Sequence, residues 1–194
     1  MTGLELITAP LSEPVTLAEI KSQARIDGTA DDAFLATLIA AARQWAEQYT
    51  ARALMPQAWR LWRDDWPGPS GVSISLPKAP LQSVSEVRLY QTDDSSSVWD
   101  AANYQIDAVS QPGRLILRAG STWPIAARAA QSISIGFTAG YANAAAVPES
   151  VKAAIRQLAA HWYEQRGEPA SAALRETPYG VQSLLNPYRL RNFI

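Results

Sequence analysis

The sequence predicts an α+β fold, and three observations support this prediction. Apolar residues recur every three or four positions near both ends of the chain, which is the spacing of an amphipathic helix. Between residues 57 and 146 they alternate with polar residues, as in half-buried strands. The chain has 194 residues, 47% of them hydrophobic, and is therefore long enough to bury one sizeable core or two smaller ones.

The first part of the chain, residues 1–56, predicts an N-terminal helical hairpin. Thr16 and Glu19 have the Thr-x-x-Glu spacing of a capping box, in which each side chain bonds the other residue's backbone. We expect this helix to end near Ile26, because Gly28 follows it and glycine readily adopts the left-handed backbone that closes many helices. A second helix begins at once with acidic residues in its first turn. Its apolar stripe consists of Leu35, Leu38, Ala42, Trp45 and Tyr49.

Residues 57–146 predict an antiparallel β-domain of roughly six strands, spaced as in a small sandwich or barrel. Turn signals separate the apolar runs, and the polar segment 92–97 has the composition of a hairpin tip. The candidate strands are residues 59–63, 72–76, 84–90, 104–107, 114–118 and 133–137.

A C-terminal helix is expected over residues 147–167. Pro148 suits the first helical position, because its missing N–H has no partner in a helix at that point. Gly167 and Pro169 stop the helix. The apolar stripe of this helix consists of Val151, Ile155, Leu158 and Trp162. Residues 168–194 then predict a linker of small and polar residues followed by an extended tail.

The composition excludes several kinds of chemistry. The chain contains no Cys, so it has no disulfide, thiolate metal site or Cys nucleophile. The single histidine, His161, cannot form a multi-His metal site, and it is the only candidate general base. It lies on an amphipathic helix, where a structural role is favoured over catalysis. Because nucleotide-binding and nucleophile-elbow motifs are also missing, the sequence predicts a non-enzyme without cofactor or metal.

Charge and hydropathy exclude further classes of partner. The chain has 17 basic and 18 acidic residues, whereas a dedicated nucleic-acid binder usually has a basic excess. The first ten residues lack the features of a signal peptide. The longest apolar stretch, within residues 33–42, is too short to span a bilayer. We therefore expect a soluble protein, made in the cytoplasm, with no membrane partner.

The seven tryptophans leave two interpretations open. Tryptophan-rich β-domains can bind carbohydrates or receptors through ring stacking, which makes such a binding module an alternative function. Large aromatic side chains also fill cores and protein interfaces. We favour the second interpretation, because most of the seven lie on apolar stripes or beside prolines.

The tail is the strongest functional clue in the residues themselves. It combines apolar and aromatic anchors with two arginines, which is typical of a peptide that docks on another surface. A strap that packs on its own domain is an equally weighted alternative. The candidate docking residues are Tyr179, Val181, Leu184, Leu185, Pro187, Tyr188, Arg189, Arg191 and Phe193.

An ordered set of short motifs covers nearly the whole chain. It includes Glu13-Pro14-Val15-Thr16-Leu17, Leu76-Pro77-Lys78-Ala79-Pro80-Leu81, Phe137-Thr138-Ala139-Gly140-Tyr141, Val147-Pro148-Glu149-Ser150-Val151, Tyr163-Glu164-Gln165-Arg166-Gly167 and Pro178-Tyr179-Gly180-Val181. In this order the motifs resemble the head–tail connector, or head-completion adaptor, family of tailed phages and phage-derived gene transfer agents.

The resemblance implies a structural protein of the virion neck. The implied fold is a small antiparallel helical bundle with an inserted β-domain, in which the C-terminal helix packs on the N-terminal helices. Such adaptors form a ring, dodecameric in this family, that binds the portal protein through the C-terminal tail. The ring extends the DNA channel and is the attachment site for stopper and tail-completion proteins. DNA passes through without sequence-specific binding.

Overall fold

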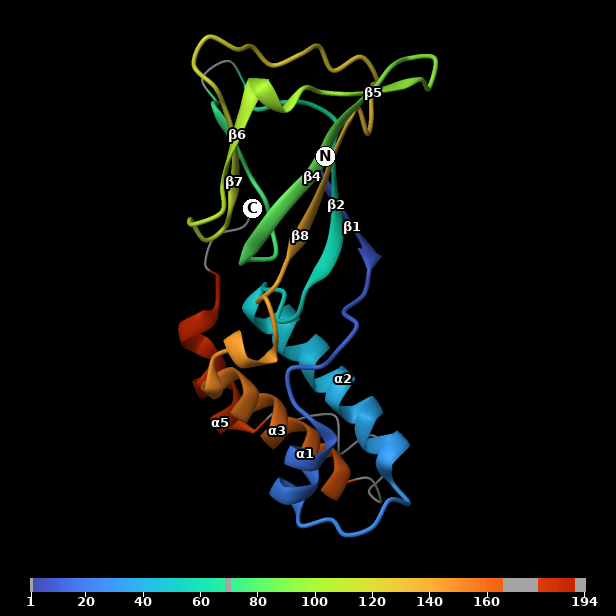
Figure 1. Ribbon diagram of the computed structural model, residues 1–194, viewed down its shortest axis with the longest axis vertical. Coiled ribbons are helices and arrows are strands. Elements are labelled where there is room, and N and C mark those ends of the chain that lie inside the picture. Colours follow the sequence, from blue (N-terminus) through green and yellow to red (C-terminus); the bar gives the residue numbers. More distant parts are fainter. Residues whose placement is uncertain (1, 69–70, 166–177, 191–194) are drawn as a thin grey trace. The chain divides into compact units, whose positions relative to one another are not determined.

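The computed structural model describes residues 2–68, 71–165 and 178–190 (Figure 1). The chain divides into two compact units. The β unit comprises Met1–Pro10 and Pro56–Gly140, and the helical unit comprises Leu11–Met55 and Tyr141–Ile194. Helices and antiparallel sheets therefore segregate into separate units, which confirms the α+β prediction.

Four α-helices form the helical unit in the part of the chain that the structure describes. They are α1 (Leu17–Ala24), α2 (Asp32–Thr50), α3 (Glu149–Glu164) and α5 (Tyr179–Leu185), with 3₁₀ turns η2 (Ala144–Ala146) and η3 (Asn186–Tyr188). The predicted capping box starts α1: the Glu19 amide donates to Thr16 Oγ1 at 3.3 Å, and the Thr16 amide donates to Glu19 Oε2 at 2.7 Å.

The end of α1 lies two residues before the expected position near Ile26. Arg25 already takes the left-handed conformation, with φ of 53°. The Ile26 amide donates to the Lys21 carbonyl at 3.0 Å, which closes the last turn. The helix therefore ends at Ala24, and Gly28 belongs to the loop before α2.

The core of the helical unit draws on all four helices. Ile20 of α1, Leu35 of α2, Ile155 of α3 and Leu185 of α5 are fully buried within it. The buried stripe of α2 is centred on Leu35, Ile39, Ala42 and Ala46, whereas Leu38, Trp45 and Tyr49 are only partly buried at its margin. The expected stripe was therefore displaced by about one position on the helix surface.

Two antiparallel sheets form the β unit. One has five strands in the order β1-β2-β8-β4-β5, and the other has three in the order β3-β7-β6. The strands are β1 (Thr2–Thr8), β2 (Gln57–Arg63), β3 (Ser73–Ser75), β4 (Leu81–Tyr90), β5 (Ser96–Val98), β6 (Tyr104–Asp107), β7 (Arg114–Leu117) and β8 (Ile133–Ala139); η1 (Ala101–Asn103) precedes β6. All six expected strands are present, and β4 and β5 form the expected hairpin around the polar segment.

Strand β1 was not predicted from the sequence. It pairs antiparallel with β2, from Thr2 opposite Arg63 to Thr8 opposite Ala58. The pairing joins segments more than fifty residues apart, so no local turn signal announces it. Residues 2–8 thus lie in the β unit and not beside the N-terminal helices, where the expected hairpin placed them.

The inner faces of the sheets supply the core of the β unit. Leu61, Val87 and Ile135 are buried on the five-stranded sheet, and Ile74 and Leu115 are buried on the three-stranded sheet. The opposite face of the large sheet carries half-buried polar and aromatic side chains. These are Arg60, Trp62, Glu86, Arg88 and Tyr90.

Candidate functional site

The C-terminal segment, residues 178–190, packs along its own helical unit. Val181 and Leu185 of α5 are fully buried, and Leu184 and Tyr188 lie against the same core. These four positions follow helical spacing, so one face of the segment carries all of them. The segment is therefore helical from Tyr179 to Tyr188 and not extended as expected. We call residues 178–190 the strap.

Tyr188 fixes the strap to two other elements. Its hydroxyl accepts a hydrogen bond from Ser150 Oγ at 2.9 Å, at the start of α3. Its backbone carbonyl accepts a hydrogen bond from Arg52 Nε, just after α2. Because Arg52 is buried, its guanidinium gains a partner there that water does not provide.

The strap also covers the C-terminal end of α2. The Leu190 amide donates to the carbonyl of Thr50 at 3.0 Å, and Thr50 is the last residue of that helix. Tyr49 Oη donates to Asn186 Oδ1 at 2.7 Å. The last carbonyl groups of a helix lack hydrogen-bond donors within the helix. The strap supplies a donor to one of them, the Thr50 carbonyl.

One arginine of the strap and two aromatic side chains of α2 form a stack. The Arg189 guanidinium lies 5.4 Å from the centre of the Tyr49 ring, and Tyr49 stacks on Trp45 at 5.1 Å with 12° between the ring planes. Arg189 is exposed, and so are Pro187 and Tyr179, the last with 85% of its surface accessible. The predicted docking residues thus divide into buried anchors and exposed positions; Arg191 and Phe193 lie outside the described residues.

A largely buried ion network in the helical unit was missed by the sequence analysis. Arg43 Nε lies 2.7 Å from Glu13 Oε2, and its Nη1 lies 2.7 Å from Glu47 Oε2. Glu47 Oε1 also accepts the Leu54 amide at 2.8 Å, which positions the segment that carries Arg52. The spacing of Arg43 and Glu47 was the available signal, but the contact with Glu13 spans thirty residues.

A second charge cluster joins α1 to α3. Hydrogen bonds from the Thr16 amide and hydroxyl lower the pKa of Glu19, and Arg156, whose Nη1 lies 3.1 Å from Glu19 Oε1, adds to this effect. Hydrogen bonds from Lys152 and Arg156 lower the pKa of Glu149. Both carboxylates are therefore held ionised by partners in the native structure.

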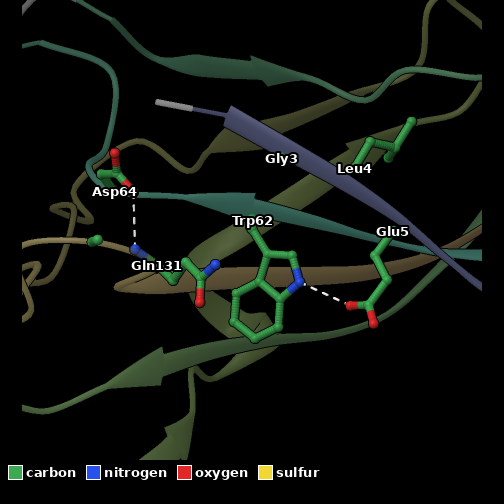
Figure 2. Close-up of a pocket in the computed structure, with 7 residues that line it drawn as sticks. Gly3, Leu4, Glu5, Trp62, Asp64 and Gln131 are labelled. Carbon is green, nitrogen blue, oxygen red and sulfur yellow. Dashed lines mark hydrogen bonds between the residues drawn. The ribbon is translucent and has the colours of Figure 1, made fainter.

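On the outer face of the large sheet, Trp62 lies in a shallow pocket of about 660 Å³. Figure 2 shows its ring between Glu5 and Gln131. Trp62 Nε1 donates to Glu5 Oε2 at 2.9 Å, and the Gln131 amide donates to Asp64 Oδ1 at 2.9 Å. The pocket is formed where β1 meets β2, and Gly3, which is paired with Trp62, lines it.

Three other tryptophans of the β unit contact one another. The rings of Trp66 and Trp123 stack at 4.6 Å, Trp99 lies 5.2 Å from Trp66, and Tyr104 lies 5.3 Å from Trp99. None of the seven tryptophans in the chain is exposed. These rings fill the interior, as the favoured interpretation expected, and do not present an open stacking surface.

Two aspartates of the β unit, Asp93 and Asp107, accept hydrogen bonds that stabilise turns. Hydrogen bonds from the Ser95 hydroxyl and amide lower the pKa of Asp93. Hydrogen bonds from the Ser110 hydroxyl and amide, followed by Arg114, hold the pKa of Asp107 well below its usual range. Each carboxylate caps a loop between strands, which is an ordinary role for aspartate.

The described residues contain no group of three His, Asp or Glu side chains that could hold a metal ion. His161 lies half-buried in the last turn of α3. Among the helices in the described ranges, none is both long and apolar enough to cross a membrane.

Comparison with protein families gives one match over most of the chain. The model described as phage gp6-like head-tail connector protein matches residues 14–111 and 125–189. The matched region therefore includes the strap as far as Arg189. It begins at residue 14, so residues 1–13 lie outside it. No curated protein matches the sequence.

Three similar solved structures come from gene transfer agent (GTA) particles. A chain from the neck of an empty GTA particle with C6 symmetry has a TM-score of 0.80 and 27% identity, covering 99% of this chain and 97% of that one. A chain from the virion of a native GTA particle has a TM-score of 0.78 and 28% identity, with coverage of 98% and 97%. A chain from the neck of a native GTA particle with C12 symmetry has a TM-score of 0.76 and 26% identity, with coverage of 99% and 97%.

Proposed function

Because the chain belongs to the phage gp6-like head-tail connector family, we propose that it is an adaptor between the head and the tail of a phage-like particle. Its role is structural, and its place is the virion neck. The observation that carries this conclusion is similarity over almost the full length of both chains to proteins of GTA necks and virions. Both units are covered, so the likeness is not confined to one common fold element.

The finer function is a ring below the portal protein. In this proposal several copies surround the channel, extend it, and offer a surface to the stopper or tail-completion protein. The GTA necks that contain similar chains were computed with C6 and C12 symmetry, which supports a rotational arrangement of copies. The net charge of -1 also suits a channel wall, because a strongly basic wall would retain DNA by phosphate contacts.

We assign portal docking to the strap and the residues that follow it. Val181 and Leu185 are anchors within the chain, so they position the strap and do not contact the portal directly. The exposed residues Tyr179, Pro187 and Arg189 are available for the contact, and Arg191 and Phe193 extend the same basic and apolar segment. Aromatic and arginine side chains on a preorganised element are the typical centres of protein interfaces.

The test is binding of purified protein to its cognate portal ring, measured by mass photometry. An Arg189→Glu variant reverses an exposed charge without touching the buried anchors, and we expect its portal affinity to fall by about tenfold or more. Arg25→Glu makes the same change at another exposed position of the helical unit and should bind normally. Equal binding by the two variants would remove the strap from the portal contact.

Deleting residues 178–194 is not a clean test of the same idea. The deletion removes Val181 and Leu185 from the core of the helical unit, so it would weaken folding as well as docking. Point variants on the exposed side separate the two effects.

A further inference from the structure

Strand β1 is an unprotected edge. It lies at one end of the five-stranded sheet, and within residues 2–68, 71–165 and 178–190 only β2 pairs with it. Leu4, Leu6 and Ile7 are 39%, 46% and 46% exposed. Proteins usually protect such edges with lysine, proline or a covering element, because open N–H and C=O groups recruit other strands. Residues 2–8 contain neither lysine nor proline.

The one charged side chain of β1 does not protect this edge. Glu5 Oε2 accepts the indole N–H of Trp62 and lies 4.0 Å from Nη1 of the Arg60 guanidinium, and both partners are on the neighbouring strand β2. Its carboxylate is therefore drawn over the face of the sheet and away from the open edge, as Figure 2 shows for the contact with Trp62.

The opposite side of the same sheet is also partly open. Strand β5 has three residues, and it pairs only with Arg88–Tyr90 at one end of β4. In the described ranges, the remaining part of β4, residues 81–86, pairs with β8 on one side and has no strand on the other. Gln82, Ser83 and Ser85 are exposed there.

The two open edges match in direction and length. Every neighbouring pair in the sheet is antiparallel, so β1 and β5 run in the same direction and β4 runs in the opposite one. If a second copy lies beside the first in the same orientation, its β1 is antiparallel to β4 and continues the line that β5 begins. Seven residues of β1 face six open residues of β4, a length of about 20 Å.

We propose that neighbouring copies in the ring join through these edges, with β1 of one copy added to residues 81–86 of the next. This proposal rests on the ring of the proposed function. The contact is heterologous, because it joins two different surfaces of the chain. Such a contact closes into a ring when the rotation that relates one copy to the next is a whole fraction of 360°. Backbone hydrogen bonds bind the added strand, and the exposed leucines of β1 are covered.

We assign a second copy of this chain as the partner, because the chain carries both edges of the contact, β1 and residues 81–86 of β4. A strand from another protein would fill one edge and leave the other open. A rotational arrangement of identical copies fills both edges at every contact, and the similar necks with C6 and C12 symmetry have such an arrangement.

Engineered disulfides test the contact directly, because the natural chain has no cysteine. Leu6→Cys is combined in turn with Ser83→Cys, Val84→Cys and Ser85→Cys, which samples the possible registers. Within one chain β2 and β8 separate β1 from β4 by roughly 14 Å, beyond the about 7 Å that a disulfide permits. Any disulfide must therefore join two copies.

We expect oxidised rings assembled on the portal to yield covalent multimers for at least one of these pairs. The matched control combines Leu6→Cys with Val109→Cys, an exposed position outside both sheets, and should remain monomeric under denaturing conditions. A second variant, Leu6→Lys, places a charge on the edge and should reduce ring assembly by about tenfold or more, whereas Val109→Lys should not.

The outcomes separate this proposal from the proposed function. If the unmodified protein forms no ring on the portal, the proposed function fails. If it forms rings, but no cysteine pair crosslinks and Leu6→Lys assembles normally, the edge contact is wrong. Crosslinking of Leu6→Cys to a stopper or tail protein would also overturn the assignment of a second copy as the partner.

Discussion

The two ends of the described chain carry similar apolar side chains but use them differently. In the strap, Val181 and Leu185 are fully buried by α3 and the rest of the helical core. In β1, Leu4 and Leu6 remain 39% and 46% exposed, although both are paired with residues of β2. The strap is thus completed within its own unit, and β1 retains an edge that another chain can complete. Apolar composition alone does not distinguish the strap from β1. They differ in whether the surface that covers the apolar side chains belongs to the same unit.

The largest effect that separates the two ends should come from Leu185→Ala. Truncating a fully buried leucine leaves a cavity, and we expect the free energy of unfolding to fall by about 2–5 kcal/mol. Denaturant unfolding followed by circular dichroism measures this change. Leu11→Ala, at a 99% exposed leucine of the same unit, is the control and should change little. An effect of Leu185→Ala as small as the control would show that the strap is not seated in solution.

The next effect should come from Tyr188→Phe. This change removes the hydroxyl that accepts the Ser150 hydrogen bond but keeps the ring against the core. We expect a loss of about 1 kcal/mol, the usual net contribution of one hydrogen bond. Amide hydrogen exchange at residues 186–190 is the measurement, and unchanged protection there would contradict the assigned anchor.

Acid should weaken the helical unit through Glu19 and Glu149. The folded structure lowers the pKa of both groups, so their contribution is present above about pH 4.5 and is lost as the pH falls through the folded-state pKa. A Glu19→Gln variant removes one of the two groups and should have a flatter dependence of unfolding free energy on pH between 5 and 3. Identical slopes for the variant and the unmodified chain would exclude Glu19 as a source of this dependence.

The smallest effect on folding should come from Leu6→Ser in isolated protein. Its side chain is half-exposed on an edge strand, so we expect a change of about 0.5 kcal/mol or less in the free energy of unfolding. The same variant should weaken ring assembly on the portal, because the edge is covered only there. A large loss of folding stability would mean that β1 is completed within the chain after all.

Local patterns predicted α1, α2, α3 and six strands, whereas α5 lies in a segment that was expected to be extended. The capping box at Thr16 and Glu19 and the alternation of Ile133, Ile135 and Phe137 are signals that lie within a few residues of one another. The role of β1 depends on pairing with β2 across more than fifty residues, and the Arg43–Glu13 contact spans thirty. Such long-range partners leave no trace in the local pattern.

The candidate site was predicted in part. The sequence located the C-terminal segment and its residues but left two interpretations, a docking peptide or a strap, because both use the same apolar anchors. The structure assigns Val181, Leu184, Leu185 and Tyr188 to the strap. The contact of the exposed positions with a portal stays a prediction.

Electron microscopy of the purified protein mixed with its cognate portal ring tests the central claim most directly. We predict a closed ring of this protein seated on one end of the portal, coaxial with its channel. Portal rings that remain bare, with this protein dispersed as single copies at saturating concentration, would contradict the assignment of a portal-bound neck adaptor.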